Sequence, residues 1–318
     1  MSERTGAHLK RRHAELLVAL DDERHLGRAA ERLHMSQPAA SKALAQLEEQ
    51  VGYALFERGT QGTLPTNAGM VMIRHARHSL GAAQRVAAEL RAAEERGASL
   101  LRLGTLPSAA PRLAPQLIAH LLGLAPRLEV KLVEGALGEL MDKLARDELD
   151  IVLGRLGSRL LPADCEVIRL HEEPILVVAR PGHPLAASQA LEAVELARWP
   201  WVLPLEATMM RERLDEAFVH AGSRPPDSSI QSNSLLATLA LLAQDDRLAA
   251  LPQAIARYCE RQGSVAVLPL RLDANFGAIG AVVNRNTAGM PVVQAAMAWL
   301  RGLPAGANQN AEILQDRA

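Results

Sequence analysis

The stretch LGRAAERLHMSQPAASKALAQLEEQVGYALFER, residues 26–58, decides how this chain folds. Its first part has the spacing of a short amphipathic helix, and HMS then interrupts that spacing. Ser36 is suited to cap a second helix, and Pro38 is tolerated in the first turn because its missing N–H needs no helical partner there. The apolar stripe expected on this second helix consists of Ala40, Leu44, Leu47 and Val51. Two short helices joined by a tight turn indicate a helix-turn-helix, whose second helix usually enters the DNA major groove.

The residues on either side extend this motif. Residues 8–21 predict a preceding helix, and residues 57–66 predict a two-stranded hairpin with a glycine-containing loop, the wing of a winged helix. Arg58, at the base of the wing, is suited to contact a phosphate or the minor groove. Residues 68–96 are rich in strong helix formers and predict one long helix.

The apolar residues of this long helix repeat at steps of three and four. They are Ile73, Ala76, Leu80, Ala83, Ala87 and Leu90. Such a seam favours a close helix–helix contact between two copies of the chain, because a DNA-binding unit of this kind reads two half-sites. The alternative is a single amphipathic helix lying on its own domain. The dimer interpretation predicts that Leu80→Asp abolishes dimerisation.

After residue 97 the pattern changes to alternating strands and helices, which predicts a parallel sheet covered by helices. The expected strands are residues 100–105, 128–134, 149–154, 166–170, 175–179, 201–203, 229–231, 248–251, 265–268 and 277–283. The expected helices are residues 109–124, 137–146, 208–221, 234–243 and 291–303. The polar tail, residues 304–318, is expected to be mobile.

The composition limits the classes of protein that remain. A chain of 318 residues is expected to form two or three domains, and its net charge of −1 means that a DNA-binding interpretation rests on the motif rather than on charge. The two cysteines, Cys165 and Cys259, have no metal-ligand spacing, so no disulfide framework, metal or cofactor is expected, and a reducing cytoplasm is the default. No bilayer-spanning run and no signal peptide are expected.

The sequence contains none of the common catalytic motifs. The adjacent acids Glu172–Glu173 and Asp245–Asp246 are interpreted as solvated turns, since neighbouring residues point in different directions. The glycines at residues 277–280 lack the spacing of a dinucleotide-binding turn. An enzyme is therefore not expected.

Three strings together carry a family resemblance: AAERLHMSQPAASKALAQLE at residues 29–48, GYALFER at 52–58 and LPTNAG at 64–69. With them the chain resembles a LysR-type bacterial transcriptional regulator along nearly its whole length. HLGRAAERLHMSQPA, residues 25–39, looks most like the branch that regulates protocatechuate breakdown or sugar-binding proteins.

The resemblance implies an α/β fold with three parts. An N-terminal winged helix-turn-helix (residues 1–67) is followed by a linker and dimerisation helix (68–96). A two-lobed effector domain similar to periplasmic binding proteins (97–303) comes last. Lobe I would comprise residues 99–170 and 275–303, and lobe II residues 171–274. The resemblance also implies a dimer of dimers that binds double-stranded promoter or operator DNA and influences RNA polymerase, with no membrane partner.

The DNA-binding residues follow from matching positions at the start of the second helix. They are Ser36, Gln37, Pro38, Ser41 and Lys42, with Arg58 on the wing. Gln37 can pair with adenine, and Lys42 can reach guanine or a phosphate. The alternatives are a plain N-cap for Ser36 and a solvated surface charge for Lys42.

The effector site is expected between the lobes, where strands end and helices begin. The candidate residues are Thr105, Ser108, Gly135, Ala136, Arg155, Thr208, Asn233 and Ser234. Arg155 could pair with a carboxylate, and a contact at Gly135 or Ala136 would use the backbone. The alternatives are helix caps for Thr105, Ser108 and Ser234 and a surface ion pair for Arg155. The effector is expected to be a small anionic metabolite such as an aromatic or sugar acid.

Two other classes of function compete with a ligand-switched regulator. A solute receptor of the transport type would use the same two-lobed domain, but residues 26–67 argue against it. An enzyme with an appended DNA-binding domain would need a convergent catalytic set. The sequence does not indicate whether transcription is activated or repressed.

Overall fold

The computed structural model describes residues 9–304 apart from residues 60–61, 97–98, 157–164, 189, 271 and 273. The chain divides into two compact units. The first comprises residues 1–102, 127–129 and 138–150, and the second comprises residues 103–126, 130–137 and 151–318. Within the described residues, none of the helices has both the length and the apolarity needed to cross a bilayer.

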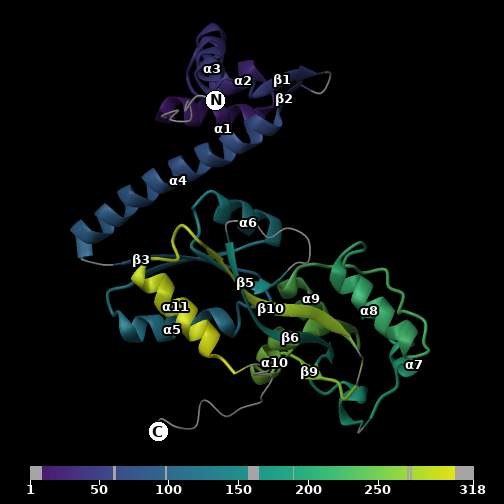
Figure 1. Cartoon of the computed structure of the whole chain (residues 1–318). Helices are drawn as coiled ribbons and strands as arrows, with labels where there is room; N and C mark the ends of the chain where they lie inside the picture. Colours follow the sequence, from purple (N-terminus) through teal and green to yellow (C-terminus); the bar gives the residue numbers. More distant parts are fainter. Residues whose placement is uncertain are drawn as a thin grey trace. The chain divides into compact units, whose positions relative to one another are not determined.

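The N-terminal part is a winged helix (Figure 1). Helices α1 (Arg11–Glu23), α2 (Leu26–Arg32) and α3 (Gln37–Val51) pack together, and strands β1 (Phe56–Gly59) and β2 (Gly62–Pro65) form an antiparallel hairpin. The core that joins the three helices includes Leu16, Leu20, Ala29, Ala30 and Ala40, all almost completely buried. The predicted helix-turn-helix and wing are confirmed.

Helix α4 (Asn67–Arg96) runs on from the wing as one long helix (Figure 1). The first half of its predicted dimer seam is used inside the chain. Ile73 and Ala76 are buried against Leu17 of α1 and Leu47 of α3, and Leu80 packs against the same cluster. Their three- and four-residue spacing therefore serves intramolecular packing, and Leu80→Asp would disturb the winged helix itself. Leu90 lies outside the residues whose side chains are described.

A second surface of α4 holds the loop around Asp147, within the same unit. His78 and Arg85 approach the Asp147 carboxylate at 3.3 and 3.4 Å, and the Arg85 guanidinium also donates to the Asp147 carbonyl. A Cβ atom at Gly81 would lie 2.0 Å from the carbonyl oxygen of Arg146. Gly81 therefore allows a close approach that any larger residue would prevent.

The rest of the chain is built on a mixed sheet. Its strands are β3 (Leu100–Thr105), β4 (Glu129–Glu134), β5 (Ile151–Arg155), β6 (Cys165–Ala179), β7 (Trp201–Val202), β8 (Leu248–Pro252), β9 (Ala266–Val267) and β10 (Asn275–Asn284). Their order is β4-β3-β5-β10-β6-β8-β7, with β9 paired to β6. The pairs β3–β5 and β7–β8 are parallel, but β10 runs antiparallel to both of its neighbours. The expected parallel sheet is thus interrupted at its centre.

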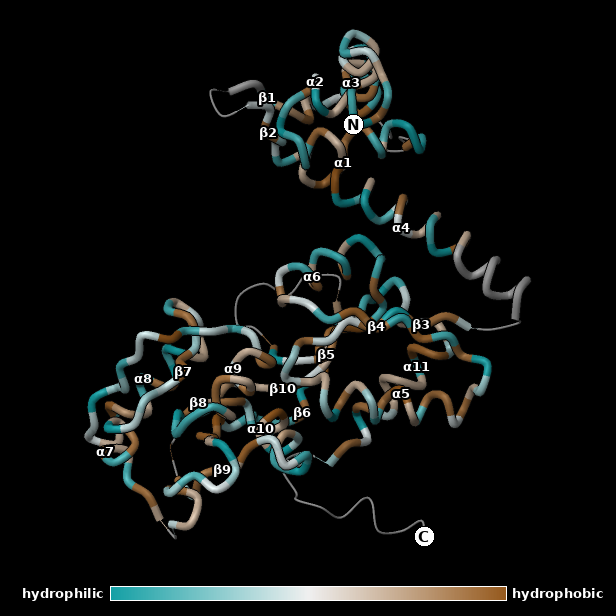
Figure 2. Tube along the Cα trace, turned by 180° about the vertical axis from the view of Figure 1, so that it is seen from behind, coloured by the Kyte–Doolittle hydropathy of each residue, from teal (hydrophilic) through white to brown (hydrophobic). Residues whose placement is uncertain are grey.

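Helices cover this sheet. They are α5 (Leu113–Leu124), α6 (Leu137–Ala145), α7 (Ala193–Leu196), α8 (Met209–His220), α9 (Leu235–Leu242), α10 (Gln253–Arg261) and α11 (Pro291–Gly302), with a short 3₁₀ turn at Pro184–Ala187. Figure 2 shows much of α5 and α11 in apolar brown. These two helices pack together, and the rings of His120 and Trp299 stack at 5.8 Å.

The sequence expectations differ from the structure in several places. The helix expected at residues 109–124 begins at Leu113, and the short helix α7 was not expected. Residues 166–179 form part of one continuous strand, β6, because its first half pairs with β10 and its second half with β8. The expected strand at 229–231 is only an isolated bridge between Leu203 and Gln231. Helix α10 follows β8 directly where the sequence analysis expected no helix, and the expectation at Leu248–Leu251 stopped one residue before that strand ends.

Candidate nucleic-acid interface and effector site

The turn of the helix-turn-helix is set by side-chain caps. The His25 Nδ1 atom accepts from the backbone N–H of Gly27 and Arg28, which starts α2. His34 has a φ of 54°, so the chain turns sharply after α2. The Ser36 hydroxyl then accepts from the Ala39 N–H at 3.4 Å and starts α3. Ser36 is therefore an N-cap, the plainer of the two roles considered for it.

The residues predicted to face DNA lie on the outer surface of α3. Gln37, Pro38 and Lys42 are exposed and Ser41 is half-buried, whereas Ala40 and Leu47 on the opposite side are buried. Lys42 forms no ion pair with any described residue. An unpaired cation beside a capped helix start has the chemistry needed to contact a phosphate or a guanine.

The wing is fastened to the end of α1. The Thr63 N–H donates to the Arg24 carbonyl at 2.9 Å. Gly62 has a φ of 102°, and a Cβ atom there would lie 2.6 Å from the same carbonyl, so the turn requires glycine. Arg58 belongs to β1, but its side chain lies outside the described residues, and its contact with DNA stays a prediction.

Predicted effector residues at the ends of two neighbouring strands, β3 and β4, lie close together. The Gly135 N–H donates to the Thr105 carbonyl at 3.2 Å, which joins the loop after β4 to the end of β3. That donor is therefore already used, so a backbone contact to a ligand at this loop would fall to Ala136. Thr105 and Ser108 are both buried, and the Ser108 hydroxyl has no hydrogen-bond partner among the described residues.

Arg155, at the end of β5, is partly buried and unpaired by any acid of the described residues. Its guanidinium lies 5.0 Å from the ring centre of Phe276, and one of its nitrogens is 2.9 Å from the sulfur of Met209. Its Nε atom is buried without a partner in the described part of the chain. Burial lowers the pKa of Arg155 from its usual high value. Arginine starts from so high a pKa that the group remains a cation at neutral pH. The expected alternative, a surface ion pair, is wrong for Arg155 within the described residues.

The lobe II candidates act mainly as caps. The Thr208 hydroxyl accepts from the Arg211 N–H and donates to the Leu205 carbonyl, so it starts α8. The Ser234 hydroxyl accepts from the Ala237 N–H and starts α9, and Asn233 beside it is exposed. Because Met209 follows Thr208, Arg155 and Thr208 are neighbours in the fold. No hydrogen bond among the described residues joins Asn233 or Ser234 to Arg155.

The structure adds a hollow that the sequence analysis missed. The hollow has a volume of roughly 600 Å³ and is open to solvent. The residues that line it include Ser108, Arg112, His171, Glu173 and Gln253. Glu173 was expected in a solvated turn but is 2% exposed. Its carboxylate accepts from the Ala254 N–H at 2.6 Å and lies 3.2 Å from His171. The sequence analysis missed α10, which follows β8 directly and begins beside β6. Glu173 on β6 therefore accepts an N–H of the first turn of α10 and is not in a solvated turn.

The described residues contain no group of three or more His, Cys, Asp or Glu side chains that could hold a metal ion. Cys165 and Cys259 form no disulfide, and burial raises the pKa of Cys259, which disfavours its thiolate.

A winged helix with an exposed α3 is joined by a long helix to an α/β domain, in which Arg155 has no acid partner among the described residues. This arrangement fits the class of ligand-responsive DNA-binding regulators. Comparison with known proteins makes this specific. Residues 11–70 match the bacterial regulatory helix-turn-helix protein of the lysR family, and residues 94–304 match the LysR substrate binding domain. The chain belongs to the LysR family of DNA-binding transcriptional regulators.

Individual relatives agree along almost the whole chain. It is 32% identical to the HTH-type transcriptional regulator GbpR of Azospirillum brasilense over 93% of this chain and 86% of that protein. It is 26% identical to the regulator PcaQ of Agrobacterium fabrum over 88% of this chain and 90% of that protein. The structure of a full-length variant of OxyR from Pseudomonas aeruginosa aligns with a TM-score of 0.59 and 25% identity over 94% of this chain and all of that one. The similarity to GbpR and PcaQ agrees with the branch of the family that residues 25–39 resemble.

Proposed function

We propose that this regulator reads two DNA half-sites as a dimer and changes its hold on DNA when a small anionic metabolite binds at Arg155. Gln37, Ser41 and Lys42 of each copy contact the bases and phosphates, with Ser36 and Pro38 shaping the helix start and Arg58 on the wing. Their exposure on α3, opposite the buried Ala40 and Leu47, supports this assignment.

The partly buried Arg155 carries the proposal for the ligand. A guanidinium that leaves water and has no carboxylate partner among the described residues is costly unless an anion completes the site. Phe276 beneath it offers an apolar face, so the favoured effector is a carboxylate attached to a ring or a short carbon frame. The Ser108 hydroxyl and the Ala136 backbone are assigned to its polar groups, together with Thr105. Thr208, Asn233 and Ser234 contribute from the opposite lobe.

The remaining parts of the assignment follow from this role. The domain boundaries proposed are residues 1–67, 68–96 and 97–303, and the working assembly is a dimer of dimers. A regulator of this family acts on chromosomal DNA in the cytoplasm through RNA polymerase and does no catalysis of its own. The match at residues 11–70 disfavours a solute receptor without a regulatory role.

The dimer contact proposed here uses the part of α4 that its own domain leaves open. Val71 and Val86 are 60% and 55% exposed, and Ala82 between them is also exposed. These residues lie on one side of the helix, turned away from Ile73 and Ala76. The small side chain of Ala82 permits a close approach of a second helix.

A thermal-shift screen tests the effector assignment. The probes are aromatic and sugar carboxylates, each paired with its neutral amide or alcohol. We expect carboxylates alone to raise the melting temperature of the wild type, and Arg155→Met to weaken their binding by about tenfold or more, as expected for a charge-assisted pair. Arg198→Met, at an exposed arginine, is the control and should respond as the wild type does. Stabilisation by neutral compounds only, or equal binding by Arg155→Met, would reject the assignment.

A further inference from the structure

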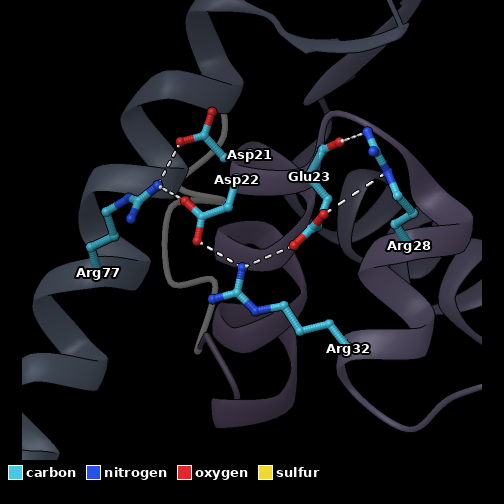
Figure 3. A network of polar contacts seen from close by, with 6 residues as sticks. All are labelled: Asp21, Asp22, Glu23, Arg28, Arg32 and Arg77. Carbon is cyan, nitrogen blue, oxygen red and sulfur yellow. Dashed lines mark hydrogen bonds and ion pairs between the residues drawn. The ribbon is translucent and has the colours of Figure 1, made fainter.

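The end of α1 carries three consecutive acids, Asp21, Asp22 and Glu23, that bind arginines from two other helices (Figure 3). One nitrogen of Arg77 on α4 lies 2.7 Å from an oxygen of Asp21 and 2.7 Å from an oxygen of Asp22. Arg32, at the end of α2, approaches the other oxygen of Asp22 at 3.0 Å and Glu23 at 3.5 Å. Asp22 therefore lies between the linker helix and the helix-turn-helix.

The Arg77 contacts are shielded from water more than an ordinary surface ion pair. The side chain of Arg77 is 15% exposed, and those of Asp21 and Asp22 are 18% and 24% exposed. Burial alone would raise the pKa of Asp22, but the hydrogen bonds and charges of Arg77 and Arg32 outweigh it and hold that pKa below its usual value. Burial alone would lower the pKa of Arg77, but its bonds to the two acids outweigh that effect and raise it. Asp22 and Arg77 are thus both charged at neutral pH.

The same short segment also holds the wing. Arg24, the residue after these acids, ends α1 in a left-handed conformation and pairs with Asp21 at 3.0 Å. Its carbonyl accepts the Thr63 N–H of β2 at 2.9 Å. Residues 21–24 are therefore in contact with the wing, with α2 and with α4.

Apolar packing alone would not fix the direction of α4 as closely. Ile73 and Ala76 bury against α1, but such contacts are non-directional and tolerate small rotations. A guanidinium shared between two carboxylates restricts the angle at which α4 leaves the winged helix. The Arg77 Nη1 atom is buried without a partner among the described residues, a cost that an apolar residue at this position would avoid. This cost is consistent with a role in geometry.

We propose that Arg77 is a positioning residue, which fixes the direction of the linker helix relative to α3 and so sets the half-site spacing that the dimer accepts. The inference rests on the proposed dimer. Arg77 does not contact DNA in this scheme. It acts through Asp21 and Asp22 on the orientation of the reading head, so the half-site sequence is unaffected by its loss.

Selection from a random 40-base-pair duplex library tests this without a known operator. The full-length wild type, Arg77→Met and Arg74→Met are compared, because Arg74 is an exposed arginine on the same helix. We expect the wild type and Arg74→Met to enrich paired half-sites at one spacing. Arg77→Met should enrich the same half-sites over several spacings, with the preference for the best spacing reduced by about tenfold, the factor that corresponds to about 1.4 kcal/mol.

Two further variants keep the test informative if Arg77→Met folds poorly. Asp22→Asn retains the shape of the side chain but removes its charge, and should broaden the spacing less than Arg77→Met because Asp21 remains. Arg77→Lys should preserve part of the preference. A single unchanged spacing in these variants, or a changed half-site sequence, would overturn the inference. If the wild type enriched no paired half-sites at all, the dimer proposal would fail and the inference with it.

Discussion

Lys42 and Arg155 are both cations without a carboxylate partner among the described residues, but their surroundings differ. Lys42 is exposed on α3, where a charge is well hydrated and available to a large polyanion. Arg155 is partly withdrawn from water beside Phe276 and Met209, where we propose that a small anion binds. The first was predictable from the motif, whereas the surroundings of the second required the fold, because its neighbours lie 54 and 121 positions away in sequence.

Lys42→Ala should weaken binding to the enriched half-sites by about 1–3 kcal/mol if the lysine reads a base. If it contacts a phosphate, the variant should instead lose affinity by the same factor for all DNA sequences. The slope of the logarithm of the binding constant against the logarithm of the salt concentration should then fall in magnitude by about one. A gel-shift titration at several salt concentrations distinguishes the two. Gln50→Ala, at an exposed residue near the end of α3, is the control. Wild-type affinity and salt slope in Lys42→Ala would show that the lysine has no part in DNA binding.

Asp22 makes stability depend on pH in a defined direction. Because its pKa is lowered in the folded state, its contribution is present above the unfolded value of about 3.9 and is lost as pH falls through the folded value. Asp22→Asn should therefore cost about 1 kcal/mol at pH 7, and the difference from the wild type should vanish at strongly acidic pH. Urea unfolding at pH 7 and at a strongly acidic pH measures both. An equal difference at both pH values would contradict this linkage.

At the scale of elements, the sequence predicted what depends on local pattern. The spacing of α2 and α3, the cap at Ser36 and the hairpin of the wing were predicted correctly, because Ser36, Pro38 and the glycines act on adjacent residues. The partner of an apolar stripe is a tertiary property, so the seam on α4 was assigned to a second copy although Ile73 and Ala76 pack on α1. The same reason explains why Glu173 was expected in solvent.

The exposed side of α4 gives a direct test of dimerisation. Val86→Asp places a charge on that side, away from the winged-helix core, and should shift the full-length chain toward monomer while leaving its melting temperature nearly unchanged. Leu80→Asp should instead lower the melting temperature, because Leu80 packs against α1 and α3. Sedimentation velocity with thermal unfolding separates the two effects. A Val86→Asp variant that sediments as the wild type does would place the dimer contact elsewhere.

At the scale of the whole molecule, α4 connects the winged helix to the α/β domain in the chain. Arg77 binds the end of α1, and one residue further on His78, with Gly81 and Arg85, meets the segment around Asp147. The order of domains and the α/β character followed from the sequence, since a change of periodicity marks the boundary near residue 97. The contacts on α4 could not be predicted, because they join residues more than fifty positions apart.

The measurement that tests the central claim most directly is DNase I footprinting with the full-length chain. The DNA is a duplex that carries the paired half-sites enriched by the wild type, with and without the carboxylate that stabilises the protein best. We predict protection of two half-sites one or more helical turns apart, and a ligand-dependent change in the protected pattern that Arg155→Met lacks. A footprint that never forms, or a ligand response that persists unchanged in Arg155→Met, would contradict the account.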